Sequence, residues 1–464
     1  MKANVFIGDR AFYRRAVSIA LPIILQNALT NFVSLLDNMM IGRLGTEPMS
    51  GAAIVNQLLL VFNLAVFGGM SGIGIFSAQY FGSGDDRGVR HTFRFKILAA
   101  LFIAAVGGAV LYFFSDPLIG LYLHEDGSGA DLAATLAYGR SYLYVIIIGF
   151  LPFALTQAYG STLREGGEAL VPMLSGSVAI ATNLALNYVL IYGKLGAPAL
   201  GVLGAAIATV ASRFVECAVI VIYAHTHTKK WTFLVGVYKT LSIPRSLIPR
   251  ILKRAIPLLA NEALWALGIA MISRCYSLRG ISAVAANNIA STLTNLTNVI
   301  CIGIGCAVSI IVGQHLGAGR LEDARRDAWR MATLSVASCV IFGTLTIILA
   351  PYFPLLYETE PYVREVAAGL IFVSGCYMPA TAFLNASYFI IRSGGRTLLT
   401  TVFDSGFLLA VSLPAAYLLA TLTDLSLVAV YALVCVFDVI KALIGFFMVK
   451  SGIWVSNIVK DAES

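Results

Sequence analysis

Twelve long apolar runs constrain the fold of this chain more than any other feature of its sequence. A helix that crosses a bilayer needs about 20 mostly apolar residues, and each run is long enough to supply one. None of the runs shows the alternation over about ten residues that is typical of barrel strands. We therefore predict an all-α, polytopic membrane protein with 12 transmembrane helices. The runs are 16–41, 50–80, 93–115, 138–159, 170–192, 200–224, 254–276, 283–312, 331–353, 366–391, 398–420 and 425–449.

The overall composition indicates that lipid is the solvent for most of the surface. Charged residues make up only 12% of the 464 residues, and hydrophobic residues make up 58%. Soluble domains carry about 25% charged residues. The net charge of +8 comes from basic residues in short loops and forms no basic stripe, so we expect no nucleic-acid partner.

The loops between the runs predict the orientation of the chain. With the N-terminus in the cytoplasm, the cytoplasmic segments hold 24 Lys and Arg residues and the opposite side holds six. Cytoplasmic loops are enriched in Lys and Arg. We therefore expect both termini in the cytoplasm of a bacterial cell, with the protein in the inner membrane.

The chain contains an internal repeat. A shift of 235 residues aligns Pro22–Gly84 with Pro257–Gly319 without a gap, and the shared positions include glutamine and several glycines. Six helices separate the two copies, so both copies have the same orientation in the membrane. Parallel repeats of this kind place the substrate site between the two halves, near the bilayer midplane.

The repeat predicts two pseudo-symmetric six-helix bundles joined by a linker. We assign residues 1–224 to the N-terminal lobe and residues 254–464 to the C-terminal lobe. The polar, basic stretch 225–253 is the predicted cytoplasmic linker, which we expect to lie on the inner leaflet as a short amphipathic segment.

Three acidic residues in the predicted spans, Asp37, Glu262 and Asp404, have no basic neighbour one helical turn away. An ionisable group inside a membrane is costly and is a functional candidate by default. A carboxyl group in such a place is either protonated or holds a cation. We interpret all three as candidate cation-coupling residues, and the alternative is a polar lock between helices.

Two further acids lie three residues from a basic residue on the same predicted helix. These pairs are Arg213 with Glu216 and Asp438 with Lys441. Residues at this spacing are within contact reach on a helix. We expect each pair to be neutralised locally.

Asn183 and Asn187 lie one turn apart in the fifth predicted span. Together with Asp37 they could form an oxygen cage for Na⁺, and the alternative is hydrogen bonding between helices. We expect no other metal site and no cofactor beyond the coupling ion. Pro22 and Pro257 open matching helices, where a missing backbone hydrogen bond permits a bend that would connect Asp37 to motion.

Several motifs resemble those of one family of transporters. They are Leu36-Asp37-Asn38, Ile41-Gly42-Arg43-Leu44-Gly45, Gln79-Tyr80-Phe81-Gly82-Ser83-Gly84, Gln314-His315-Leu316-Gly317-Ala318-Gly319, Pro172 with Asn183 and Asn187-Tyr188, Gly204-Ala205-Ala206-Ile207-Ala208-Thr209, Asn261-Glu262 and Arg392-Ser393-Gly394-Gly395. With these motifs, the chain resembles bacterial members of the multidrug and toxic compound extrusion (MATE) family across essentially its full length.

This resemblance implies a V-shaped pair of six-helix lobes that alternates between inward- and outward-facing states. It also implies export of amphipathic, often cationic compounds against entry of Na⁺ or H⁺. The first-helix acid of the family matches Asp37, its fifth-helix asparagine matches Asn183, and the seventh-helix glutamate of its NorM-like branch matches Glu262. The family often has aspartate at the place of Asn187, and the tenth-helix aspartate of that branch has no counterpart here.

We therefore predict a secondary active multidrug exporter, monomeric, that works by antiport. The coupling ion and the lobe that carries it stay open. The chain has no ATP-binding motif, so the energy must come from an ion gradient. The main alternative is a flippase for a lipid-linked precursor, which would need clustered cationic residues in its cavity. A channel or receptor gains nothing from the repeat, and an enzyme is disfavoured because no nucleophile–base pair is present.

Overall fold

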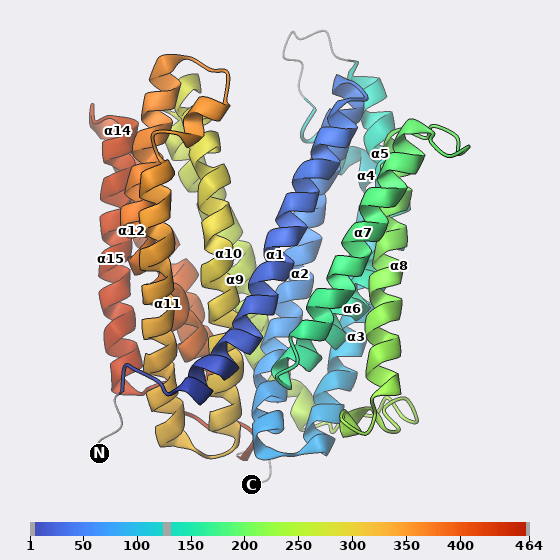
Figure 1. Cartoon of the computed structure of the whole chain (residues 1–464), viewed down its shortest axis with the longest axis vertical. Helices are drawn as coiled ribbons and strands as arrows, with labels where there is room; N and C mark the ends of the chain where they lie inside the picture. Colours follow the sequence, from blue (N-terminus) through green and yellow to red (C-terminus); the bar gives the residue numbers. More distant parts are fainter. Residues whose placement is uncertain (1–4, 124–130, 461–464) are drawn as a thin grey trace. The chain divides into compact units, whose positions relative to one another are not determined.

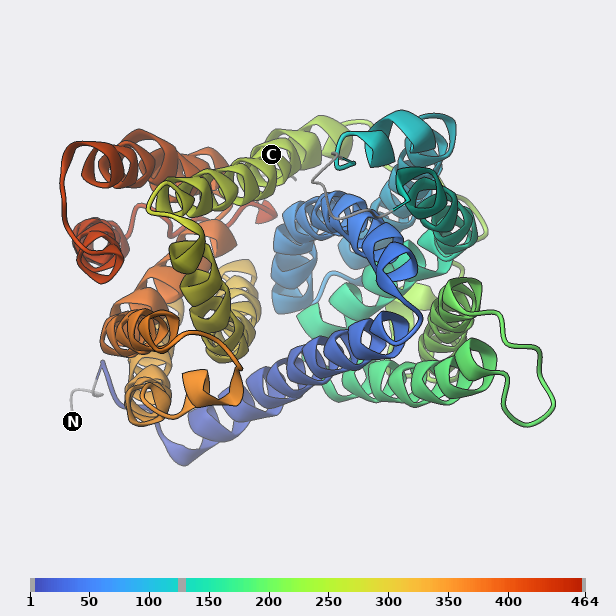
Figure 2. The same ribbon diagram turned by 90° about the horizontal axis from the view of Figure 1, so that it is seen from above.

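The structure is a computed structural model of the chain and describes residues 5–123 and 131–460. The described residues form helices joined by short connections and contain no β-strand, so the prediction of an all-α fold is confirmed (Figure 1, Figure 2). The longer helices are α1 (Arg10–Gly42), α2 (Thr46–Ser83), α3 (Asp86–Phe113), α5 (Leu132–Ile148), α6 (Phe150–Glu165), α7 (Leu170–Tyr192), α8 (Val202–Thr226), α9 (Leu247–Ser277), α10 (Ile281–Gly317), α11 (Leu321–Leu349), α12 (Pro361–Ser393) and α15 (Leu427–Ser451).

Shorter elements complete the chain. They are α4 (Ser115–Gly120), the 3₁₀ turns η1 (Thr232–Leu234) and η2 (Phe353–Leu356), α13 (Thr397–Thr401), the two π-helical turns η3 (Val402–Gly406) and η4 (Leu408–Ser412), and α14 (Leu413–Leu422). The elements from α13 to α14 follow one another directly and form a single span, Thr397–Leu422.

Each predicted run has a counterpart among the helices. Within the described ranges, 11 helices are long and apolar enough to cross a membrane. A twelfth span consists of α5 and α6, which are bent by 45° at the break between them. The predicted run 138–159 is therefore a broken span whose two parts meet at Gly149.

Large apolar side chains remain exposed along many of these helices. Phe102 on α3 exposes 69% of its surface, and Ile341 on α11 exposes the same fraction. Exposed apolar area on this scale marks contact with an apolar partner. Because the helices also have the length of a bilayer, that partner is lipid, and the chain is a multi-pass membrane protein.

Two compact units make up the chain. The first comprises the described residues of Met1–Ile24, Ala78–Asp85 and Arg250–Ser464, and the second comprises Leu25–Ser77 and Asp86–Pro249. The units follow the two halves of the chain except where α1 and α2 each contribute one end to the first unit. The predicted domain boundaries at residues 224 and 254 stay a prediction.

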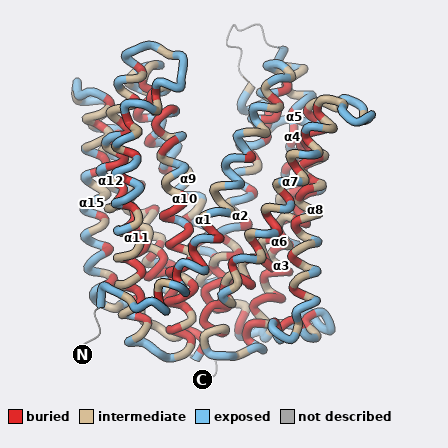
Figure 3. Tube along the Cα trace, in the orientation of Figure 1, coloured by how far each residue is buried: buried red, intermediate tan, exposed pale blue. Residues whose placement is uncertain are grey.

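In the first unit, α10 is the most buried of the spans. Its buried residues run almost without a gap from Val299 to Gly317 (Figure 3). The end of α2 crosses α10 in that stretch. A Cβ atom at Gly82 would lie 1.9 Å from the carbonyl oxygen of Gln314, and one at Gly317 would lie 1.9 Å from that of Gln79. The Gln-x-x-Gly motifs of the two repeats therefore pack backbone against backbone.

The linker differs from the expectation. Helix α8 continues to Thr226 and α9 begins at Leu247, so the connection is shorter than predicted. Some of its apolar residues are buried against the protein, since Trp231, Phe233 and Val237 are each at least 95% buried, whereas Val235 and Tyr238 are more than half exposed. The side chain of Arg94 on α3 holds the linker by donating to the carbonyl oxygens of Val237 at 2.8 Å, Ser242 at 3.1 Å and Gly236 at 3.3 Å. The linker is thus bound to α3, and its predicted position on the inner leaflet as an amphipathic segment stays a prediction.

The two prolines that were predicted to open helices lie inside them. Helix α1 begins at Arg10 and continues through Pro22, and α9 begins at Leu247 and continues through Pro257. The hydroxyl of Thr401 donates to the carbonyl oxygen of Pro257 at 2.9 Å. The placement at the helix start is therefore wrong, and the role of both prolines in bending stays a prediction.

Candidate functional site

Asp37, Asn183 and Asn187 come together in the second unit, as the sequence predicted. We call these three residues, with Thr209 and Arg213, the Asp37 cluster. The Nδ2 group of Asn187 donates to Asp37 Oδ1 at 2.6 Å and to Asn183 Oδ1 at 3.0 Å. The Nδ2 group of Asn183 donates in turn to Thr209 Oγ1 at 3.3 Å.

Helix geometry explains this arrangement. Asn183 and Asn187 lie four residues apart on α7, which places both amides on one face, and both residues are buried. Near the end of α1, the hydroxyl of Tyr192 donates to the carbonyl oxygen of Met40 at 3.2 Å. This contact holds the end of α1 against α7, so the carboxylate of Asp37 meets the amide of Asn187.

The oxygen atoms of the Asp37 cluster fit a hard cation. Asn187 Oδ1 is buried and has no hydrogen-bond partner in the structure. A buried polar atom without a partner is rare in proteins and calls for an explanation. Carboxylate, amide and hydroxyl oxygens are the ligands that cations such as Na⁺ prefer. This set of oxygen ligands is supplied by Asp37, Asn183, Asn187 and Thr209.

A basic residue also acts on Asp37, which the sequence did not predict. The charge of Arg213 on α8 is near enough to interact with the carboxylate of Asp37. Arg213 NH1 also pairs with Glu216 Oε2 at 3.2 Å, which confirms the predicted local pair. The guanidinium is therefore shared between two acids.

The other two predicted acids, Glu262 and Asp404, meet in the first unit. We call them, with Asn261, Tyr388 and Lys441, the Asp404 cluster. Asn261 Nδ2 donates to Asp404 Oδ2 at 3.1 Å and to the hydroxyl of Tyr388 at 3.4 Å. That hydroxyl donates to Glu262 Oε1 at 3.4 Å. Residues from α9, α12, η3 and α15 thus form one connected network.

Lys441 does not make the predicted pair. Its ammonium contacts Asp404 Oδ1 at 2.8 Å, and Asp438 instead accepts a hydrogen bond from Ser412 Oγ at 3.3 Å. The predicted contact of Lys441 with Asp438 is therefore wrong, although the charge of Lys441 still acts on the carboxylate of Asp438. The base on α15 thus pairs with an acid of η3, a different helical segment.

Glu262 has a basic neighbour as well. The charge of Arg392 on α12 acts on the carboxylate of Glu262. The guanidinium of Arg392 lies over the rings of Phe389, at 5.3 Å, and Tyr388, at 5.9 Å. All three acids that have no basic neighbour along their own helix thus interact with a basic residue of another helix.

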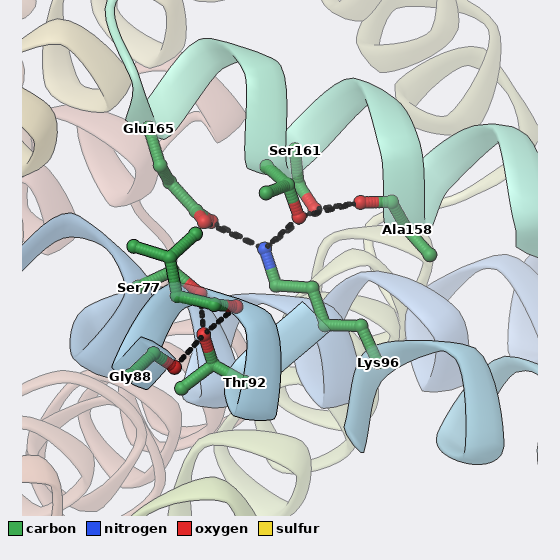
Figure 4. Close-up of polar contacts among 9 residues, drawn as sticks. Ser77, Gly88, Thr92, Lys96, Ala158, Ser161 and Glu165 are labelled. Carbon is green, nitrogen blue, oxygen red and sulfur yellow. Dashed lines mark hydrogen bonds and ion pairs between the residues drawn. The ribbon is translucent and has the colours of Figure 1, made fainter. Parts of the chain in front are cut away.

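Sequence reasoning also missed a buried ion pair in the second unit (Figure 4). Lys96 Nζ contacts Glu165 Oε2 at 2.6 Å and Oε1 at 2.8 Å, and it also donates to Ser161 Oγ at 2.9 Å. The side chain of Lys96 is fully buried. Lys96 was counted with the basic residues of the cytoplasmic side although it falls inside the predicted run 93–115, and α3, which begins at Asp86, places it well within the helix.

A polar pair beside the ion pair fills the space between α2 and α3. Ser77 Oγ donates to Thr92 Oγ1 at 2.9 Å (Figure 4). A Cβ atom at Gly74 would lie 2.3 Å from Glu165 Oε1, so a glycine leaves room for this carboxylate. The described residues contain no group of three His, Cys, Asp or Glu side chains that could hold a metal ion.

The chain is similar to known transporters over most of its length. The sequence profile of the MatE family matches residues 22–189 and 257–418. A relative from Thermotoga maritima, described as "Probable multidrug resistance protein NorM", is 23% identical over 460 residues, which are 97% of this chain and 95% of that protein. The multidrug resistance protein PmpM of Pseudomonas aeruginosa is 24% identical and is matched over 89% of this chain and 85% of its own length.

Solved structures share the fold. A mutant of the MATE transporter VcmN of Vibrio cholerae superposes with a TM-score of 0.86 over 96% of this chain and 98% of that one, at 18% identity. A transporter of the MOP superfamily from Pyrococcus furiosus superposes with a TM-score of 0.81 over 96% of each chain, also at 18% identity.

Proposed function

Because this chain belongs to the MatE family of membrane transporters, we propose that it exports small amphipathic or cationic molecules in exchange for an inward-moving cation. The names of its relatives support this proposal, since several are multidrug resistance proteins. The bacterial relatives also support a place in the inner membrane.

The observation that carries the proposal is the contact of Asp37 with the buried Asn187, whose amide also binds the buried Asn183. A carboxylate inside a membrane span can be neutralised by taking up H⁺ or by binding Na⁺. The amide nitrogen of Asn187 donates to Asp37, and the amide oxygen of Asn187 is the buried atom that has no hydrogen-bond partner. Uptake and release of one cation at this cluster would shift the balance between two conformations of the transporter, which is what antiport requires.

The chemistry of the cluster leaves Na⁺ and H⁺ as the candidate coupling ions. Na⁺ is supported by the amide and hydroxyl oxygens around Asp37, since a hard cation needs several oxygen ligands at once. H⁺ is supported by the carboxylate alone. The excess of Lys and Arg on one side of the spans supports cytoplasmic termini, and Na⁺ or H⁺ would therefore enter toward that side.

The experiment is dye efflux from liposomes that contain the purified protein. An inward Na⁺ gradient and an inward H⁺ gradient are imposed separately, on the wild type and on Asp37→Asn. We expect efflux under one gradient, which names the ion, and we expect Asp37→Asn to fall to the rate seen without any gradient. The matched control is Glu322→Gln, which also removes one acid but at a side chain that is 88% exposed.

The outcomes separate the alternatives. Efflux that survives in Asp37→Asn contradicts the assignment of coupling to Asp37 and directs attention to Glu262. Absence of efflux under both gradients contradicts the antiport proposal itself. The flippase alternative is not favoured, because Arg213 and Lys441 each contact an acid and offer no free cationic surface to a pyrophosphate.

A further inference from the structure

The ion pair of Asp404 and Lys441 differs from the surroundings of Asp37. Both oxygens of Asp404 have a donor, because Oδ1 receives the ammonium of Lys441 at 2.8 Å and Oδ2 receives the amide of Asn261 at 3.1 Å. The amide oxygen of Asn261 is also used, since Ser405 Oγ donates to it at 2.7 Å. The hydrogen-bonding capacity around Asp404 is therefore satisfied by the protein itself.

The ammonium of Lys441 is held tightly in this place. Only 10% of the side chain of Lys441 and 19% of that of Asp404 is exposed. The ammonium also lies 5.5 Å from the centre of the ring of Phe403, where the face of an aromatic ring attracts a cation. The single positive charge of Lys441 therefore interacts with both a carboxylate and an aromatic ring.

The backbone at Asp404 is irregular. Asp404 lies in the π-helical turn Val402–Gly406, and a second π-helical turn, Leu408–Ser412, follows at once. Such turns are rare within helices and occur often at functional sites. The hydroxyls of Thr401 and Ser405 bind the carbonyl oxygens of Pro257 and Asn261, both at 2.9 Å, and hold this segment against α9.

We propose that Lys441 is a tethered cation that fills, in the first unit, the place that a free Na⁺ would otherwise take beside Asp404. An ammonium and Na⁺ are both small monovalent cations that bind a carboxylate. A tethered group has a high effective concentration at its partner, so it outcompetes a free ion. The cluster consequently exchanges no cation, and coupling is confined to the Asp37 cluster. This last consequence rests on the proposed function.

The test uses Na⁺ binding and needs no transport. All variants carry Asp37→Asn, which removes Na⁺ binding at the Asp37 cluster from the measurement. Melting temperatures of the purified protein in detergent are compared in NaCl and in choline chloride of equal concentration. We expect the parent to melt at the same temperature in both salts. Lys441→Met should show a higher melting temperature in NaCl, because the carboxylate of Asp404 is then left without its partner and takes up Na⁺.

The double variant Asp404→Asn with Lys441→Met is the matched control, because it removes both charges. We expect it to fold and to lose the difference between the two salts. The proposal is overturned if Lys441→Met melts at the same temperature in both salts, or if it fails to fold in either salt while the double variant folds. A parent that is itself stabilised by Na⁺ through Asp404 would also overturn it. Failure of dye export would not affect any of these results, so the two proposals are tested separately.

Discussion

Lys96 shows how one residue inside a membrane bundle depends on its partner. Its side chain is the least exposed among the ion-paired cations of the described residues, and it donates to Glu165, Ser161 and Thr162. A buried ion pair contributes little to stability compared with two apolar residues, because both charges lose their water. Removing one partner alone is costly, since the other charge then stays buried without compensation.

We therefore expect Lys96→Met to lower the free energy of unfolding by about 3–5 kcal/mol. The double variant Lys96→Met with Glu165→Gln should recover most of that loss, because no charge stays buried. Thermal unfolding of the purified protein in detergent measures both effects. If the double variant is as unstable as the single one, the loss comes from packing and not from the unpaired carboxylate.

Helices α2 and α10 meet at one glycine from each repeat. At this crossing the Cβ atom of an alanine would overlap a backbone carbonyl oxygen, either that of Gln314 or that of Gln79. A backbone atom cannot rotate away as a side chain can, so the helices themselves would have to separate. Small residues at helix crossings allow close approach of two backbones in membranes. The close approach explains why glycine stands at the same place in both copies of the motif.

We expect Gly82→Ala and Gly317→Ala each to destabilise the protein by about 1–3 kcal/mol, as overpacking does. Gly120→Ala is the matched control, since a Cβ atom there would have no atom within 4 Å. Melting temperatures of the three variants test the expectation. Equal melting temperatures for all three would show that the crossing tolerates a side chain.

At the scale of the whole molecule, segments that are distant in the sequence build the first unit together. The side chain of Gln79 at the end of α2 accepts from the backbone N–H of Ile458 at 2.9 Å and donates to the carbonyl oxygen of Ser456 at 3.2 Å. Asn457 donates to the carbonyl oxygen of Gly317 at 3.1 Å. The segment after α15 is thus bound to the α2–α10 crossing, and Trp454 within this segment is 99% buried.

We expect Trp454→Ala to cost about 3–5 kcal/mol, as other large buried aromatic residues do. Its indole N–H donates to the carbonyl oxygen of Val449 at 3.0 Å, which also accepts from the backbone N–H of Gly452 at 3.3 Å, so the substitution removes one of the two hydrogen bonds to that oxygen. The neighbouring Ile453→Ala, at a residue that is 48% exposed, is the control and should change the melting temperature little. A similar loss in both variants would indicate that the segment as a whole, and not the buried indole, determines stability.

Local properties of the sequence were enough to predict much of the architecture. Hydropathy over about 20 residues predicted every span, because a bilayer selects helices by length and apolar content alone. The repeat was also visible in the sequence, since Gln79 and Gln314 occupy matching positions when the two halves are aligned. The spacing of Asn183 and Asn187 on one helix predicted a shared face, and the ligand preference of a hard cation suggested Asp37 as their partner.

Contacts between helices determine the partners of the buried charges, which no local sequence pattern contains. Lys441 lies 37 residues from Asp404, and Lys96 lies 69 residues from Glu165, so helical spacing carries no information on either pair. The burial of the linker depends on Arg94 in the same way, because it binds carbonyl oxygens more than 140 residues away. Hydropathy and periodicity report how each helix meets its solvent, whereas the partner of a buried charge is set by which helices pack side by side, and only the tertiary structure contains that.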